Sequence, residues 1–165
     1  YKGVDTLIKA IPWLKNKNFK ILIYGRPEMS KDFFINLSKE LKVFEKIEWK
    51  LEFISNIDVH SAFLNSDIVV FPYRHIDQSS VLLSSLSYGK PFLASDIGGF
   101  SETLNHDING YLFKSGDYKE LAYYLDILIN SEVKRKAFGK ANLELSTNWP
   151  SSLEIAHLYE NVYTN

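Results

Sequence analysis

The chain has 165 residues, of which 45% are hydrophobic, and a net charge of −1 at pH 7. This length and composition predict one globular domain and exclude general disorder, while the near-neutral charge excludes binding of nucleic acid through an overall basic field. Because there is no cysteine, disulfides, thiol nucleophiles and thiolate metal sites are also excluded. No apolar run approaches the ~18 residues of a membrane span.

The first half of the chain alternates helical and strand patterns. Apolar residues at helical spacing predict helices over residues 3–15, 30–42 and 57–65. Short apolar runs predict strands over residues 19–25, 47–54 and 67–73. Ser30 is the candidate N-cap of the second helix, and we expect Pro12 to bend or end the first helix because it lacks a backbone N–H.

The second half continues the alternation and then becomes helical. Helices are predicted over residues 79–88, 101–104 and 131–145, and strands over 91–95 and 111–113. Gly89 is expected just after the first of these helices, and Gly98-Gly99 is expected to form a turn. Capping boxes start two more helices, at Asp117 with Glu120 and at Ser151 with Glu154.

This order of elements predicts an α/β fold with a mainly parallel sheet, helices on both of its faces and a helical C-terminus. In such sheets, ligands bind at the carboxyl ends of the strands. The loops over residues 25–26, 53–57, 73–80 and 95–99 are therefore the candidate binding loops.

The start of the predicted helix at residue 79 carries small polar side chains. The first turn of a helix has unpaired backbone N–H groups and a partial positive charge. We expect Gln78, Ser79 and Ser80 to let a diphosphate approach that backbone closely. The alternative is that Asp77 or Ser79 only caps the helix and that Ser80 faces solvent.

Further candidates lie in the other loops. Lys2 is a point charge suited to a phosphate, although a lone lysine is ordinarily only solvated. Gly25 allows a close backbone approach, and Arg26 could pair with a phosphate, unless the two form an ordinary turn at the end of a strand. Glu102 is suited to a sugar hydroxyl or to capping the next helix.

Several motifs occur together in a fixed order. KGVDTLIKA (2–10), DIVVFPY (67–73), SVLLSSLSYGKPFLASDIGGFSETL (80–104) and NGYLF (109–113) resemble the signature of retaining glycosyltransferases of family 4, over essentially the whole chain. The resemblance implies the carboxy-terminal, donor-binding domain of a two-domain GT-B enzyme, which is its Rossmann-like half. It implies that the diphosphate meets Lys2, that Asn56 lies near the base, and that no metal or other cofactor is needed.

The sequence departs from this signature at two positions. The family usually carries two glutamates separated by seven residues, and here Ile76 and Ser84 stand in their places. No catalytic residue is assigned. The substrate-binding residues that the pattern and the resemblance imply together are Lys2, Gly25, Arg26, Asn56, Asp77, Gln78, Ser79, Ser80, Val81, Ser84, Gly98, Gly99 and Glu102.

The resemblance implies transfer of a sugar from a nucleotide-sugar such as a UDP- or GDP-sugar to a glycan or lipid acceptor, with retention, as in polysaccharide biosynthesis. We expect the acceptor to be held by an amino-terminal domain absent from this chain, so that the chain alone is inactive. The expected location is the cytoplasm, with peripheral association at the inner face of the membrane. The alternatives are a non-catalytic module that binds a nucleotide-sugar or a partner, and a nucleotide-sugar epimerase.

Overall fold

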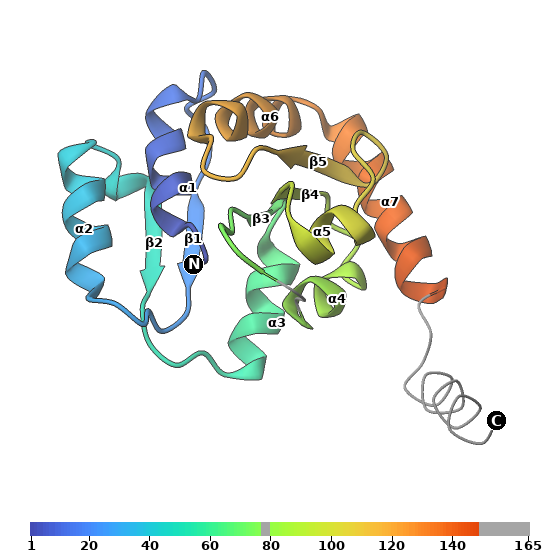
Figure 1. The fold of residues 1–165 in the computed structure, drawn as a ribbon, viewed down its shortest axis with the longest axis horizontal. Helices are drawn as coiled ribbons and strands as arrows, with labels where there is room; N and C mark the ends of the chain where they lie inside the picture. The colour runs from blue at the N-terminus through green and yellow to red at the C-terminus, as the bar shows by residue number, and fades with distance from the viewer. Residues whose placement is uncertain (77–79, 149–165) are drawn as a thin grey trace.

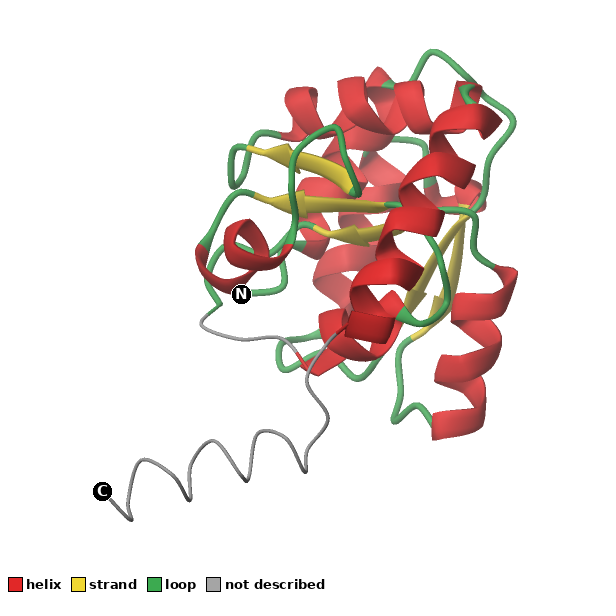
Figure 2. Ribbon diagram, turned by 90° about the vertical axis from the view of Figure 1, so that its right-hand side faces the viewer, coloured by secondary structure: helices red, strands yellow, loops and turns green. Residues whose placement is uncertain are grey.

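The computed structural model of the chain describes residues 1–76 and 80–148. Within that part, every strand pairing is parallel, and helices lie on both sides of the strands (Figure 1, Figure 2). The predicted α/β class with parallel strands is therefore confirmed.

The helices and strands follow the predicted order. The helices are α1 (Val4–Ala10), α2 (Lys31–Glu40), α3 (Asn56–Asn65), α4 (Ser80–Leu86), α5 (Gly98–Thr103), α6 (Tyr118–Asn130) and α7 (Glu132–Asn148). The strands are β1 (Ile21–Tyr24), β2 (Ile47–Lys50), β3 (Val69–Phe71), β4 (Phe92–Ser95) and β5 (Gly110–Phe113). Two short 3-10 helices, η1 (Ile11–Trp13) and η2 (Phe44–Lys46), complete the set.

The strands form two sheets rather than the single sheet that we predict from the sequence. One sheet pairs β1 with β2, and the other has the order β3-β4-β5. In the described residues no backbone hydrogen bond joins β1 to β3. Leu22 of β1 and Val70 of β3 instead line the same two cavities between the sheets.

Two elements are shorter than the sequence suggests. The first helix ends at Ala10, and Pro12 lies in η1, where its missing N–H costs no helical hydrogen bond. Strand β2 ends at Lys50, four residues before the predicted end. The chain turns there into α3, whose N-cap Ser55 accepts a hydrogen bond from the Asp58 N–H.

The helix caps are partly as predicted. Ser30 caps α2 by accepting a hydrogen bond from the Asp32 N–H. Asp117 caps α6 by accepting from the backbone N–H groups of Lys119 and Glu120. The Glu120 carboxylate accepts from the Lys114 N–H instead of completing the capping box. The other predicted box, Ser151 with Glu154, lies outside the described residues.

Three apolar clusters hold the elements together. Leu93 and Phe113 pack with α1, α6 and α7 on one face of the larger sheet, while Phe92 and Phe100 pack with α4 on its other face. The third cluster joins α1 and α2 to β1 and β2. Because α1 contributes to the clusters of both sheets, it fixes the loops after β1 and β3 relative to each other.

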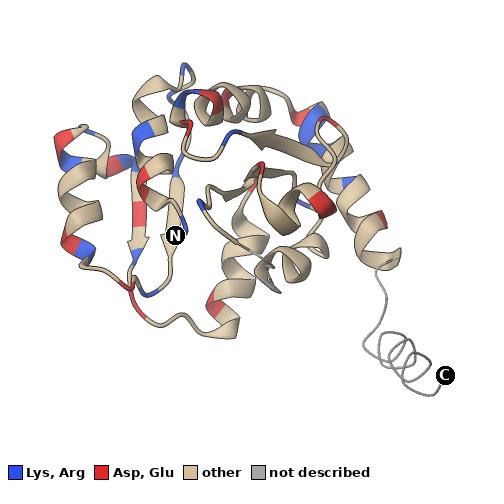
Figure 3. Ribbon diagram, in the orientation of Figure 1, with Lys and Arg blue, Asp and Glu red and all other residues tan. Residues whose placement is uncertain are grey.

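The surface has mixed charge. In the view of Figure 3, segments with Lys or Arg are interspersed with segments carrying Asp or Glu along the helices. Within residues 1–76 and 80–148, none of the helices has both the length and the apolar character needed to cross a bilayer.

Candidate functional site

The first three residues are seated against the loop that follows β3. Gly3 has a φ of 63°, and a Cβ at this position would lie 1.7 Å from the carbonyl oxygen of Pro72. The Arg74 N–H donates a hydrogen bond of 2.8 Å to the carbonyl oxygen of Tyr1. Only glycine fits this contact, and the contact holds Lys2 beside the carboxyl end of β3.

A cavity of about 420 Å³ opens at this place, at the carboxyl end of β1. Three of the residues predicted from the sequence, Lys2, Gly25 and Arg26, line it together. Its other lining residues are Tyr1, Gly3, Val4, Asp5, Ile23, Tyr24, Pro27, Glu28, Met29, Phe33, Phe34, Leu51 and Arg74. We call it the first cavity.

Gly25 leaves its side of the cavity open. It follows β1 with a φ of 136°, and its N–H donates to the carbonyl oxygen of Lys50 at 3.0 Å. No atom lies within 4 Å of the place that a Cβ would occupy. The backbone at Gly25 is therefore open to close approach.

An ion pair that the sequence analysis misses borders the same cavity. The Arg74 guanidinium lies 2.5 Å from Oδ2 of Asp5, and Lys9 Nζ lies 3.4 Å from the same oxygen. Burial alone raises the pKa of Asp5, but hydrogen bonds and charges from Arg74 and Lys9 outweigh this and lower it below its ordinary value. Asp5 is thus ionised at neutral pH, and it orients an Arg74 side chain that remains half exposed.

This ion pair makes stability depend on pH. Because the pKa of Asp5 is lower in the folded state, its contribution is complete above the ordinary carboxyl range and is lost as pH falls through the folded-state pKa. At pH 7 we expect Asp5→Asn to lower the free energy of unfolding by about 1–2 kcal/mol. Urea unfolding of both proteins at pH 7 and pH 3 should show the difference shrinking at pH 3; an equal difference at both pH values would contradict the assignment.

A second cavity of about 390 Å³ adjoins the first. Lys2 and Gly25 line both cavities, so they stand at the junction. The second cavity extends from this junction to Val59 on α3 and Val81 on α4. Tyr73 also lines it, and burial, with a smaller effect of Tyr1, raises the pKa of Tyr73 to about 12. The phenol is therefore neutral and adds no negative charge at physiological pH.

Helix α4 brings one predicted residue to the second cavity. Leu82 and Leu86 anchor the helix in the core, at 2% and 1% exposure, while Val81 is 42% exposed and lines the cavity. Gly89 takes the left-handed conformation expected after this helix, with a φ of 61°. Ser84 is exposed and lines neither cavity. Asp77, Gln78 and Ser79 lie outside the described residues, as does the side chain of Ser80.

The remaining predicted residues lie apart from both cavities. Gly98 and Gly99 do not form a turn ahead of the next helix; they are the first two residues of α5, which starts three residues earlier than predicted. Phe100 is fully buried, which ties this first turn to the core. Glu102 on α5 and Asn56 at the start of α3 are exposed and line neither cavity.

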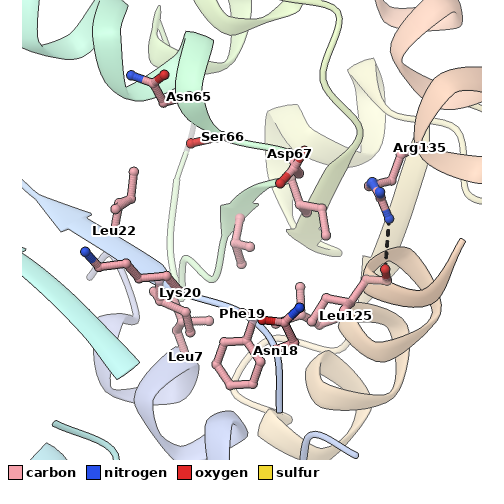
Figure 4. A pocket seen from close by; sticks show the side chains of 14 residues that line it. Leu7, Asn18, Phe19, Lys20, Leu22, Asn65, Ser66, Asp67, Leu125 and Arg135 are labelled. Atoms are coloured by element: carbon pink, nitrogen blue, oxygen red, sulfur yellow. Dashed lines mark hydrogen bonds between the residues drawn. The ribbon is translucent and has the colours of Figure 1, made fainter. Parts of the chain in front are cut away.

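Another cavity, of about 380 Å³, lies at the opposite, amino-terminal ends of β1 and β3 (Figure 4). Its polar residues include Lys20, Asp67 and Arg135, and the Arg135 guanidinium donates to the carbonyl oxygens of Leu128 and Ile129. None of the residues predicted from the sequence lines it.

The apolar wall of the first cavity is also missed by sequence analysis. Phe33 is one of the apolar positions of the helical pattern over residues 30–42, yet its side chain is 46% exposed, and that of Met29 is 53% exposed. The sequence does indicate that one of these rings is exposed, because Phe33 and Phe34 are adjacent and adjacent side chains of a helix point about 100° apart. Only Phe34 reaches the core, at 9% exposure.

Comparison with known proteins identifies the family. Residues 1–144 match the family model described as glycosyl transferases group 1. The chain belongs to this family. The match runs from before α1 into α7, as far as residue 144, and includes both cavities at the carboxyl ends of the strands.

Relatives of this group 1 domain are longer proteins. An uncharacterized glycosyltransferase of Methanocaldococcus jannaschii, MJ1607, is 28% identical over 130 residues, which cover 78% of this chain and 33% of that protein. The capsular polysaccharide biosynthesis glycosyltransferase CapM of Staphylococcus aureus is 22% identical over 98% of this chain and 42% of its own length. The chain thus spans about a third to two fifths of these relatives.

Solved structures share the fold of the group 1 domain. Anabaena HepE, solved in complex with UDP, superposes over 100% of this chain and 46% of its own with a TM-score of 0.87 and 19% identity. The C-terminal domain of the Francisella tularensis group 1 protein LpcC gives a TM-score of 0.76 at 22% identity, over 88% of this chain and 78% of its own. The predicted fold, the Rossmann-like half of a GT-B glycosyltransferase, is confirmed.

Proposed function

We propose that this group 1 domain binds the nucleotide-sugar donor of a glycosyltransferase. The observation that carries the proposal is the meeting of Lys2, Gly25 and Arg26 in one cavity at the carboxyl end of β1. The adjoining cavities of about 420 and 390 Å³ are each of the size of ordinary ligand pockets. UDP-bound HepE, a protein of the same fold, supports a nucleotide ligand.

The charges of the first cavity suit a diphosphate. Lys2, Arg26 and Arg74 line it together with two acidic residues, Glu28 and Asp5, and Asp5 is engaged by Arg74 and Lys9, so the lining keeps an excess of positive charge. When the bond between sugar and diphosphate breaks, negative charge grows on the leaving phosphate oxygens. Cations fixed in place before the reaction stabilise that charge without having to reorganise, and this is the role that we assign to Lys2.

The finer features of the reaction are part of the same proposal. We propose transfer with retention to a glycan or lipid acceptor, which a further domain of a longer protein binds, so that this domain alone transfers no sugar. The greater length of the relatives supports a further domain, and CapM supports a polysaccharide product. For the full-length protein we propose a place at the inner face of the membrane.

A non-catalytic binding module is the second candidate. Ile76 and Ser84 occupy the positions of the two glutamates that are usual in family 4, so contacts that carboxylates would make to ribose and sugar hydroxyls are absent there. Such a domain would bind the nucleotide-sugar without transferring the sugar. Assaying the full-length protein for sugar transfer and for nucleotide binding separates these two functions.

Calorimetric titration with UDP, GDP and ADP tests the donor site. We expect one nucleotide to bind with a dissociation constant in the micromolar range, about −8 kcal/mol, because the site combines an excess of positive charge with apolar side chains. Lys20→Ala is the control, since Lys20 lines only the cavity at the opposite rim. No binding of any nucleotide up to millimolar concentration would overturn the proposal.

A further inference from the structure

The lysines of the chain are concentrated in two segments. Residues 13–20 and 39–46 together hold six lysines, two glutamates and no other charged residue, which gives them a net charge of +4. Because the whole chain has a net charge of −1, the remaining residues carry −5. We call the six lysines the lysine rim; they are Lys15, Lys17, Lys20, Lys39, Lys42 and Lys46.

The fold brings the two segments to one place. They precede β1 and β2, whose first residues Ile21 and Ile47 are paired, so both lie at the rim where these strands start, opposite to the arrowheads in Figure 1. Lys46 Nζ donates a hydrogen bond of 2.7 Å to the carbonyl oxygen of Lys17, and it lies 5.4 Å from the centre of the Phe19 ring. The lysine rim is therefore one basic surface, at the end of the strands away from the first and second cavities.

Five of the six lysines have no carboxylate partner in the described part of the chain. Lys20 Nζ lies 2.5 Å from Oε2 of Glu48, but the others take part in no ion pair with residues 1–76 or 80–148. On α7, by contrast, Lys134, Lys136 and Lys140 each pair with a carboxylate. The unpaired charges of the lysine rim leave a positive field that extends outward from this surface.

The loop before β1 is fixed to α6 through its backbone. The Asp126 carboxylate accepts hydrogen bonds of 2.8 and 3.2 Å from the N–H groups of Lys15 and Asn16, and the Asn16 side chain donates to that of Asn130. Lys15 and Lys17 are exposed. The loop therefore presents these two lysines to the outside.

A tryptophan borders the same loop. Trp13, the last residue of η1, is 53% exposed, and Lys119 Nζ lies 4.5 Å from the centre of its ring. The surface thus combines cations with an exposed indole ring.

One member of the lysine rim stands where a helix usually has glycine. Lys42 follows α2 with a φ of 57°, and its N–H donates to the carbonyl oxygen of Lys39 at 3.0 Å. A residue with a side chain adopts this left-handed conformation at a cost in free energy that glycine avoids. The sequence therefore places a positive charge here at the expense of stability.

We propose that the lysine rim binds the surface of an anionic lipid bilayer, an inference that deepens the place at the membrane proposed above and does not depend on the donor site. Clusters of about four to eight basic residues attract anionic lipids, and tryptophan is typical of the headgroup region. The rim contains lysine and no arginine; an ammonium on a flexible stem suits mobile headgroups, whereas a guanidinium suits fixed bidentate contacts. The acidic remainder of the domain is repelled by the same lipids, so the rim faces the bilayer.

This orientation leaves the proposed donor site accessible. The first and second cavities lie at the carboxyl ends of the strands, so a bilayer at the opposite rim does not cover them. A nucleotide-sugar can then enter from the water. An acceptor anchored in the same bilayer has to reach past the depth of the domain, which favours a glycan chain over a short lipid headgroup.

Vesicle sedimentation of the full-length protein tests the proposal. We expect binding to vesicles of phosphatidylcholine with phosphatidylglycerol and none to phosphatidylcholine alone, with the binding weakened by salt. Lys15→Gln with Lys17→Gln should lower the partition coefficient at least about tenfold. Lys136→Gln with Lys140→Gln is the matched control, because it changes the net charge equally at two α7 side chains that are 77% and 80% exposed; it should bind as the unaltered protein does.

Two single variants separate the contributions. Trp13→Ala should weaken vesicle binding by a factor that salt does not reduce, because burial of the ring is not electrostatic. Lys42→Gly should be at least as stable as the unaltered protein in urea and yet bind vesicles about fivefold less tightly. A merely structural role of Lys42 would not lower vesicle binding.

Absence of binding to anionic vesicles, or equal losses in the Lys15/Lys17 and Lys136/Lys140 variants, would overturn the inference. So would tighter binding to heparin or duplex DNA than to vesicles, lost with the same lysines, which would show a polyanion as the partner. All of these variants should keep the nucleotide affinity of the unaltered protein. If the unaltered protein binds anionic vesicles but no nucleotide, it is the proposed function that fails.

Discussion

Replacing Gly3 with alanine is expected to lower both the free energy of unfolding and the affinity for nucleotide. The new Cβ would lie 1.7 Å from the carbonyl oxygen of Pro72, far inside van der Waals contact with a backbone atom that has little room to move. The backbone at Gly3 is also left-handed, with a φ of 63°, which alanine adopts only at a cost. Residues 1–3 must therefore move away from the loop that follows β3.

The variant Gly116→Ala separates the cost of the left-handed backbone from the cost of the clash with Pro72. Gly116 has a φ of 82°, but a Cβ there meets no atom within 4 Å, so this variant bears the backbone strain alone, about 1 kcal/mol. Gly3→Ala should lose about 2 kcal/mol more in urea unfolding, from overpacking. Equal losses in the two variants would show that the contact with Pro72 does not constrain the chain.

Gly3→Ala should also weaken nucleotide binding. Lys2 is attached directly to Gly3, and the Arg74 N–H bonds to the carbonyl oxygen of Tyr1, so displacing the segment removes one cation from the site and loosens another. We expect the affinity of Gly3→Ala for the nucleotide that binds the unaltered protein to fall at least about tenfold, or 1.4 kcal/mol. The affinity of Gly116→Ala should be unchanged. A folded Gly3→Ala protein with normal affinity would place the nucleotide away from Lys2.

The order and type of the elements could be predicted from sequence because each depends on local pattern. Ser30 and Asp117 cap helices as their positions imply, and Gly89 follows α4 in the left-handed conformation. The separation of β1 from β3 could not be predicted, since whether two parallel strands pair depends on contacts between distant segments. The full burial of Phe100, which starts α5 at Gly98, is likewise a tertiary effect.

The residues of the candidate site also divide into those that the sequence predicts and those that depend on contacts between distant segments. Lys2 was predicted from the family resemblance, and Gly25 and Arg26 from their position after a strand; the structure places all three around one cavity. The partnership of Asp5 with Arg74 joins residues 69 positions apart, and nothing local signals it. Apolar spacing also does not distinguish the exposed Phe33, which lines the cavity, from a side chain that packs inward.

Lys2→Ala is expected to weaken nucleotide binding by about 10- to 100-fold, equal to about 1.4–2.8 kcal/mol. Lys2 stands at the junction of the two cavities, and its charge is less compensated than that of Arg74. Arg74 lies 2.5 Å from a carboxylate oxygen of Asp5, whereas Lys2 takes part in no ion pair with the residues that the structure describes. Lys2→Arg keeps the charge and should keep most of the affinity.

Comparing the loss of affinity for UDP with the loss for pyrophosphate shows which part of the nucleotide Lys2 contacts. A cation that binds the diphosphate must lose the same free energy for pyrophosphate as for UDP, and the loss must shrink as salt screens an exposed charge. Titrating Lys2→Ala and the unaltered protein with both ligands at low and high salt therefore locates the diphosphate. If Lys2→Ala weakened UDP but not pyrophosphate, Lys2 would lie near another part of the nucleotide, and the placement of the diphosphate at the junction would be wrong.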